Sequence, residues 1–156
     1  MSGSTLPAQP PLWNAKRAEL DSYYDKPEPC CFVIFSISGD LTHRLIVPAL
    51  YNLAEAGLLP DPFCIVGIVR KPMSESDLRR SLMQGLETHA TRPVKTEIAD
   101  KLLNCMTCVE ADPSDQSSFD TLSKACERLE TRTGTCGNRL LYLAVPPKSP
   151  KHQRSM

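Results

Sequence analysis

The sequence predicts an α/β fold, a Rossmann-like open parallel sheet of about four strands with helices on both faces. Three observations favour it. An apolar, β-branched run at residues 31–35 stops at a short polar turn, and a helical pattern follows from Leu41 to just before Gly57. Strand-like and helical stretches then alternate, which is typical of parallel sheets with right-handed crossovers. The first strand is apolar on both faces, as expected when helices cover both sides of a sheet.

The chain is long enough for one domain with a hydrophobic core. It has 156 residues, of which 41% are hydrophobic and 14 are prolines. We expect a proline-rich N-terminal tail over residues 1–29, one α/β domain over residues 30–147 and a polar C-terminal tail over residues 148–156. The N-terminal stretch is compatible with a helical turn around residues 13–20; Trp13, Tyr23 and Tyr24 can fold back onto the domain, and a disordered leader is an equal alternative.

The first strand is expected at residues 31–35 and the polar turn at residues 36–40. Asp40 is the expected N-cap of the helix that follows. Pro48 lies inside the helical pattern, and this position predicts a kink or two helical pieces. Gly57 is expected to end the helix.

The later elements repeat this pattern of apolar strands and amphipathic helices. Ser74 opens a helix with a start that resembles a capping box. The expected elements are a strand at 63–69, helices at 74–88 and 94–103, a strand at 105–110, a helix at 113–129, a turn at 133–137 and a strand at 139–144.

Charge and hydropathy argue against several classes of partner. The chain has 18 basic and 18 acidic residues, so its net charge gives no reason to propose nucleic acid or an anionic membrane as a partner. No apolar run approaches the roughly 20 residues of a membrane span. The N-terminus shows no signal-peptide pattern, and we therefore expect a cytoplasmic location.

The seven cysteines are expected to be reduced thiols. Cys105 and Cys108 have the spacing of zinc ligands, but residues three apart in a strand point to opposite faces. No second pair with this spacing supplies further ligands, so we expect no metal site. His43, His89 and His152 have no nucleophile or carboxylate at a helpful spacing and are expected on the surface.

The polar turn after the first strand is a candidate phosphate site, because helix-start N–H groups lack partners and the helix dipole is positive there. Ser38 can donate its hydroxyl and N–H to a phosphate, or form a hydrogen bond at the helix start instead. Gly39 is the only glycine in the turn, where a standard dinucleotide fingerprint has three, and a plain turn residue is the alternative. Asp40 fits capping better than anion binding.

Arg70 and Lys71 follow the second predicted strand. In a dinucleotide-binding βαβ unit this strand end reaches the adenosine ribose. A carboxylate there bonds the 2′-hydroxyl of NAD, and an arginine accommodates the 2′-phosphate of NADP. Arg70, with no carboxylate beside it, therefore favours NADP; the alternative is a surface arginine at a strand end.

With these residues in view, the sequence resembles the N-terminal, coenzyme-binding part of glucose-6-phosphate dehydrogenase over roughly residues 31–147. The turn FSISGDLT (35–42) resembles the family's FGASGDLA/T turn. Two further segments, PALYNLA (48–54) and GLLP (57–60), resemble the family's first helix and the loop that follows it. FCIVGIVR (63–70) and LLYLAVPP (140–147) resemble the strands that carry the family's 2′-phosphate arginine and a coenzyme-lining tyrosine. The resemblance implies an NADP-binding domain, with these residues at coenzyme-site positions: Ser38, Gly39, Asp40, Leu41, Arg70 and Tyr142.

Three positions depart from the family pattern. The first turn glycine of the family is Ser36 here, the small residue after it is Ile37, and the lysine after the turn is Leu45. A β-branched residue such as Ile37 is strained or obstructive if the backbone must bend there as glycine does. Leu45 removes a cation near the coenzyme.

The family resemblance also implies a reaction. The whole enzyme oxidises glucose 6-phosphate to 6-phosphogluconolactone, the first step of the pentose phosphate pathway; a histidine removes a proton while hydride passes to NADP. The EKP segment and RIDHYLGK motif that hold the sugar phosphate and this histidine do not occur in these 156 residues. We therefore predict that this chain cannot catalyse the reaction by itself. Glucose 6-phosphate is expected as a partner only if the missing domain is supplied.

Two alternatives remain open. One is a non-catalytic module for nucleotide binding or protein interaction. The other is a decayed chain whose uncovered strand edge leads to self-association.

Overall fold

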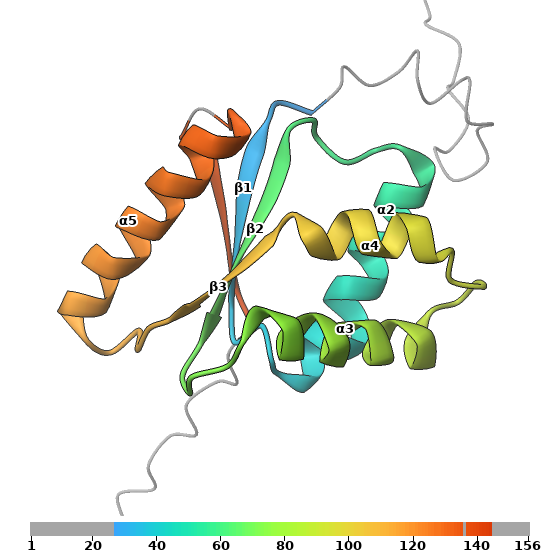
Figure 1. Ribbon diagram of the computed structural model, residues 1–156, viewed down its shortest axis with the longest axis horizontal. Helices are drawn as coiled ribbons and strands as arrows, with labels where there is room; N and C mark the ends of the chain where they lie inside the picture. The colour runs from blue at the N-terminus through green and yellow to red at the C-terminus, as the bar shows by residue number, and fades with distance from the viewer. Residues whose placement is uncertain (1–26, 136, 145–156) are drawn as a thin grey trace, which may run out of the picture.

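The computed structural model describes residues 27–135 and 137–144, which form three layers: helices, a parallel sheet and a further helix (Figure 1). The predicted α/β class is therefore confirmed. The predicted turn at 13–20, the C-terminal tail and nearly all of the N-terminal tail lie outside the described residues. The elements are β1 (Cys30–Phe35), the π-helical segment η2 (Thr42–Ile46), α2 (Val47–Ala56), β2 (Phe63–Val69), α3 (Glu75–His89), α4 (Thr96–Asn104), β3 (Met106–Glu110), α5 (Gln116–Thr133) and β4 (Arg139–Leu143).

The four strands form one sheet in the order β3-β2-β1-β4, with all pairs parallel. The chain moves outward from β1 through β2 to β3 and then returns to the other side of β1 as β4. The strand order therefore reverses between β1 and β4. Open α/β sheets bind their ligands outside the carboxyl ends of the strands at such a switch point.

Helices cover both faces of the sheet, as the sequence predicts. In Figure 1 the sheet is seen nearly edge-on, with α2, α3 and α4 on one face and α5 on the other. Phe32 and Ile34 of β1 join the core cluster under α2–α4, whereas Val33 and Phe35 join the cluster under α5. All four are at most 7% exposed, which confirms β1 as a central strand.

The first helix is built from two pieces, as Pro48 predicts. The π-helical segment η2, closed by the Val47 N–H donating to the Thr42 carbonyl, passes directly into α2, and Pro48 lies in the first turn of α2, where it has no N–H to donate to the preceding turn. Gly57 ends α2 with a left-handed φ of 70°, as predicted. The capping role predicted for Asp40 is wrong: no side chain caps η2, and the Asp40 carboxylate pairs with Arg44 at 3.0 Å instead.

Other element ends follow local signals. β2 has the predicted bounds, and Ser74 caps α3 by accepting the N–H of Asp77 at 3.1 Å. α5 is capped by Asp115 and runs to Thr133, beyond the end predicted at residue 129. Gly134, with a left-handed φ of 80°, is the residue that ends it.

The outer edge of β3 is closed by side chains from α3. The Cys108 N–H donates to Oε1 of Glu75 at 3.4 Å, and the Met106 carbonyl accepts from Nη2 of Arg79 at 3.1 Å. Glu75 and Arg79 lie one helical turn apart and form an ion pair at 3.3 Å. This pair satisfies backbone groups that an open edge would present to another strand.

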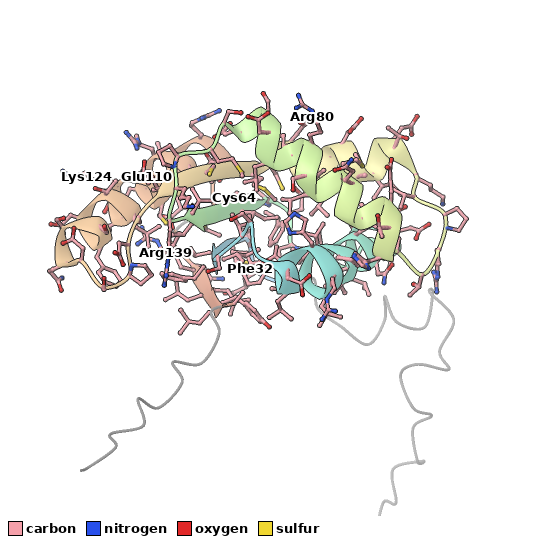
Figure 2. All side chains as sticks on the ribbon, turned by 90° about the horizontal axis from the view of Figure 1, so that it is seen from below. Phe32, Cys64, Arg80, Glu110, Lys124 and Arg139 are labelled. Carbon is pink, nitrogen blue, oxygen red and sulfur yellow. The ribbon has the colours of Figure 1, made fainter. Side chains whose placement is uncertain are left out.

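The opposite edge of the sheet, at β4, is uncovered within the described residues. Its side chains from Leu140 to Leu143 are 40–66% exposed. The start of β4 is nevertheless held firmly, because Arg139 donates to both carboxylate oxygens of the buried Glu130 at 2.6 and 2.9 Å. Figure 2 shows the side chains of β4 extending beyond the sheet, with Arg139 at its start.

Three buried thiols lie together between the sheet and α5. Cys31, Cys64 and Cys126 are at most 2% exposed and belong to one core cluster. The hydrogen bond with Cys126, followed by burial, raises the pKa of the Cys31 thiol above its ordinary value. All cysteines of the described residues are free thiols.

Cys105 lies at the C-terminal cap of α4, not in β3 as predicted, and its thiol donates to the Leu102 carbonyl at 2.9 Å. Burial raises the pKa of Cys105 to about 11. The described residues contain no group of three or more metal-ligating side chains with the geometry of a metal site. Among the same residues, no helix has the length and apolar character needed to cross a membrane.

Candidate functional site

The turn between β1 and η2, residues 36–41, lies at the carboxyl end of the sheet, at its lower end in Figure 1. Two bonds hold its bend: the Ser36 carbonyl accepts the Gly39 N–H at 2.9 Å and the Thr42 hydroxyl at 3.2 Å. Ser36 has a φ of +60°, a conformation that favours glycine and costs other residues about 1–2 kcal/mol. The turn therefore keeps a glycine-like bend although a serine stands there.

The Ile37 side chain points into the core and does not obstruct the turn. It is fully buried and packs on Gly67 of β2, where an added methyl carbon would lie only 2.4 Å from Cδ1 of Ile37. The Ile37 N–H donates to the Ile68 carbonyl at 3.2 Å, which extends the pairing of the two strands. The expectation of strain or obstruction at Ile37 is therefore wrong, because the left-handed residue is Ser36.

The first N–H groups of the helix remain available. Those of Ser38, Asp40 and Leu41 meet no acceptor among the described residues. Ser38 and Asp40 are exposed, and Leu41 is half-buried. Together with the positive end of the helix dipole, these N–H groups can receive a phosphate.

His43 connects the turn to α3 by hydrogen bonds. The prediction that His43 is a surface residue is therefore wrong. Its Nδ1 donates to the Gly39 carbonyl at 2.7 Å, and its Nε2 is hydrogen-bonded to the Ser81 hydroxyl at 2.8 Å. The half-buried ring also packs against Gly85. His89 is exposed, and His152 lies outside the described residues.

Arg70 follows β2 directly and is exposed at the same end of the sheet as the turn. The bond between Ile37 and Ile68 holds the end of β2 beside the turn. Arg70 also lies near the loop after β3: hydrogen bonds from Ser114, and secondarily the charge of Arg70, hold the pKa of Asp112 below its usual range.

Tyr142 lies on the other side of β1. It pairs in register with Ile34, just before the turn, and its ring meets Phe32 edge-on at 6.2 Å between centroids. Its exposed fraction is 40%. The topology thus places the turn residues Ser38, Gly39, Asp40 and Leu41 between Arg70 at the end of β2 and Tyr142 in β4.

The site is an open surface formed by strand ends. A groove of about 750 Å³ lies elsewhere, between β3 and α5, and contains none of the six predicted site residues. Leu45 is 57% exposed, so the position of the family's lysine carries an apolar side chain on the surface of η2.

A family model described as "Glucose-6-phosphate dehydrogenase, NAD binding domain" matches residues 33–152. The chain belongs to this family. The match includes the turn, the end of β2 and the whole of β4. The family and fold expected from the sequence are confirmed, while the coenzyme roles of the six residues stay predictions.

Curated relatives carry the same name. "Glucose-6-phosphate 1-dehydrogenase 2" of Mycobacterium tuberculosis is 36% identical over 121 residues, which cover 78% of this chain and 24% of that protein. The glucose-6-phosphate 1-dehydrogenase of Chlamydia muridarum is 34% identical over 120 residues, with shares of 76% and 24%. The chain thus spans about a quarter of the length of these relatives.

Solved structures agree on the fold. A glucose-6-phosphate dehydrogenase in complex with its substrate glucose-6-phosphate matches with a TM-score of 0.67 and 26% identity, over 80% of this chain and 26% of that chain. Glucose-6-phosphate 1-dehydrogenase from Mycobacterium avium matches with a TM-score of 0.64 and 21% identity, over 78% of this chain and 24% of that chain. The second likeness supports the fold alone.

Proposed function

We propose that these residues form the NADP-binding domain of a glucose-6-phosphate dehydrogenase, which oxidises glucose 6-phosphate to 6-phosphogluconolactone. One observation carries the proposal. The helix-start N–H groups of Ser38, Asp40 and Leu41, which meet no acceptor in the part of the chain that the structure describes, lie at the carboxyl end of β1, beside the switch point of the sheet. A coenzyme diphosphate is the ligand that such a position suits in a dinucleotide-binding domain.

The residues present fit this coenzyme despite the departures from the family pattern. Ile37 is withdrawn into the core, and the bend of the turn is maintained with a serine at position 36. The Asp40 carboxylate, which would repel a phosphate, is partly neutralised by Arg44 at 3.0 Å. The surface outside the turn is therefore not covered by Ile37, and the negative charge of Asp40 beside it is partly balanced by Arg44.

Arg70 supports NADP over NAD. Its exposed guanidinium follows β2 with no carboxylate beside it in the sequence, at the strand end that reaches the ribose in this fold, and the nearby Asp112 carboxylate comes from the loop after β3. Tyr142, which is 40% exposed on the other side of β1, would line the site. The bound coenzyme supplies hydride transfer, and these residues would bind and orient it.

The sugar chemistry is not assigned to any described residue. In the family the sugar phosphate and the proton abstraction belong to motifs that this sequence does not contain. The domain would therefore contribute coenzyme binding, and glucose 6-phosphate would bind only where the remaining part of the enzyme is supplied.

The proposal is tested by titrating NADP and NAD against the purified chain while the melting temperature is followed. At a coenzyme concentration about a hundredfold above Kd, binding stabilises the folded state by about 2.7 kcal/mol. For a domain of this size that is a rise on the order of 10 °C. We expect the rise at lower concentrations of NADP than of NAD; no rise with either coenzyme overturns the proposal.

A further inference from the structure

The loop that follows β3 lies beside Arg70 at the carboxyl end of the sheet. Val69, the last residue of β2, pairs in register with Glu110, the last residue of β3. The pairing continues one residue further, because the Ala111 N–H donates to the Val69 carbonyl at 3.1 Å. Arg70 and Asp112 each follow directly after this bond. The backbone therefore brings a cation and a carboxylate to neighbouring strand ends.

The Asp112 carboxylate is held in place by its own loop. Its Oδ1 accepts the Ser114 N–H at 2.9 Å and the Ser114 hydroxyl at 2.7 Å. The Asp112 N–H donates to the Ser118 hydroxyl at 3.0 Å. An aspartate that bonds the backbone two residues further on forms an Asx turn. The carboxylate is therefore fixed in position although the residue is exposed.

Arg70 and Asp112 interact through charge without forming an ion pair. The hydrogen bonds from Ser114 are the main cause that holds the pKa of Asp112 below its ordinary value, and the charge of Arg70 adds to them. No carboxylate of the described residues lies within ion-pair distance of Arg70. The guanidinium is therefore not occupied by Asp112, yet a ligand beside Arg70 also meets the field of this carboxylate.

We propose that Asp112 is a specificity-determining residue of the coenzyme site, which lowers the preference of the domain for NADP over NAD. The inference rests on the proposed function, in which Arg70 meets the 2′-phosphate. A carboxylate fixed near Arg70 offsets part of the attraction of the guanidinium and repels the phosphate itself. NAD has a 2′-hydroxyl at this position, which carries no charge and can donate to a carboxylate. Asp112 therefore disfavours NADP alone.

The test is the ratio of NADP affinity to NAD affinity, measured by calorimetric titration of the purified chain. Asp112→Asn removes the charge and retains an oxygen that can accept from Ser114, so the turn is preserved. We expect its NADP affinity to rise by about two- to fivefold, the usual size of an exposed charge interaction. NAD affinity should not rise. Asp120→Asn, at an exposed position within α5, removes one negative charge elsewhere and should leave the ratio unchanged.

Ionic strength separates an effect of charge from an effect of loop shape. The gain in NADP affinity of Asp112→Asn should shrink between about 0.01 M and about 1 M salt, because the screening length falls from about 30 Å to about 3 Å. Asp112→Ala removes the bonds of the turn as well as the charge. It should therefore lower the melting temperature more than Asp112→Asn does.

The outcomes distinguish this inference from the function on which it rests. A parent chain that binds neither coenzyme overturns the proposed function and the role of Asp112 with it. A parent chain that binds NADP, with an unchanged affinity ratio in Asp112→Asn or an equal rise for both coenzymes, overturns the role of Asp112 alone. A gain that persists undiminished at high salt also overturns it, because the effect would then not come from charge.

Discussion

Ser36 and Ile37 show how two substitutions in a tight turn can be absorbed by different means. Ser36 adopts the left-handed conformation itself, and hydrogen bonds from Gly39 and Thr42 to its carbonyl hold it there. Ile37 is accommodated because β2 carries Gly67 directly beneath it. The sequence alone identifies both departures, but the compensating contact of Ile37 lies on another strand and is visible only in the fold.

Arg70 gives the most direct test of coenzyme preference. Arg70→Ala should weaken NADP binding by about tenfold or more, because a charged hydrogen bond to phosphate contributes about 1.5–3 kcal/mol. NAD binding should be nearly unchanged, since NAD lacks the 2′-phosphate. Coenzyme titrations followed by melting temperature measure both affinities.

The matched control for this prediction is Lys71→Ala, which removes the neighbouring exposed cation. It should leave the preference for NADP in place. Equal losses of NADP and NAD affinity in Arg70→Ala would reject the assignment of Arg70 to the 2′-phosphate.

His43 is the residue that sequence reasoning missed. Its partner Ser81 lies 38 positions away, and only the spacing of four residues to Gly39 is a local signal. His43→Ala should lower the free energy of unfolding by about 1–2 kcal/mol, because two hydrogen bonds at a half-buried site are lost. It should also weaken coenzyme binding, since the ring holds the Gly39 carbonyl in place.

Two comparisons separate these effects. His43→Asn retains a donor for the Gly39 carbonyl and should recover part of the coenzyme affinity. Ser81→Ala removes only the second hydrogen bond and should affect unfolding in urea more than binding. Unchanged binding in His43→Ala would show that the ring stabilises the domain without positioning the turn.

At the scale of the elements, the contact between α3 and β3 carries a dependence on pH. A hydrogen bond from the Thr107 hydroxyl at 2.5 Å, and secondarily one from the Cys108 N–H, hold the pKa of Glu75 below its ordinary value of 4.5. Because the pKa is lower in the folded state, the stability contributed by ionised Glu75 is complete above the ordinary value. It is lost as the pH falls through the folded pKa.

Glu75→Gln should therefore lose less stability than the parent chain on acidification below about pH 4.5. Melting temperatures measured across this range check the difference. Glu87→Gln, an exposed position on the same helix, controls for the removal of one negative charge. Parallel curves for the parent chain and Glu75→Gln would contradict the role of Glu75 at this edge.

The sequence predicts elements well where a local signal sets their ends. Ser74 begins α3, Gly57 ends α2, and Pro48 divides the first helix, each for a reason contained in a few neighbouring residues. Asp40 shows the limit of such signals, because its carboxylate forms an ion pair with Arg44, one helical turn later, instead of capping the helix. The ion pair of Glu130 with Arg139 links α5 to β4 and is likewise beyond any local pattern.

For the molecule as a whole, the strand order β3-β2-β1-β4 determines which predicted residues meet. Alternation along the chain predicts a parallel sheet but not the side of β1 on which the last strand lies. Family resemblance supplied Tyr142 as a site residue, and the fold places it across β1 from Arg70. β4 is exposed because no strand lies beyond it in the described sheet. No motif within the strand itself predicts this position.

The whole chain should bind coenzyme without catalysing the family reaction. Mixed with glucose 6-phosphate and NADP, it should produce no NADPH, because the family's sugar-phosphate and proton-abstraction motifs do not occur in its 156 residues. The absorbance of the reduced coenzyme measures this, on a preparation that shows a melting shift with NADP. NADPH formation by such a preparation would contradict the division of roles proposed above.

The three thiols sealed between the sheet and α5 make the motion of that helix measurable. Cys31, Cys64 and Cys126 cannot be alkylated while α5 is in place, whereas the half-buried Cys30 remains within reach of a reagent. The rate at which the sealed sulfurs are labelled under native conditions would therefore report how often α5 lifts from the sheet, and at what free-energy cost.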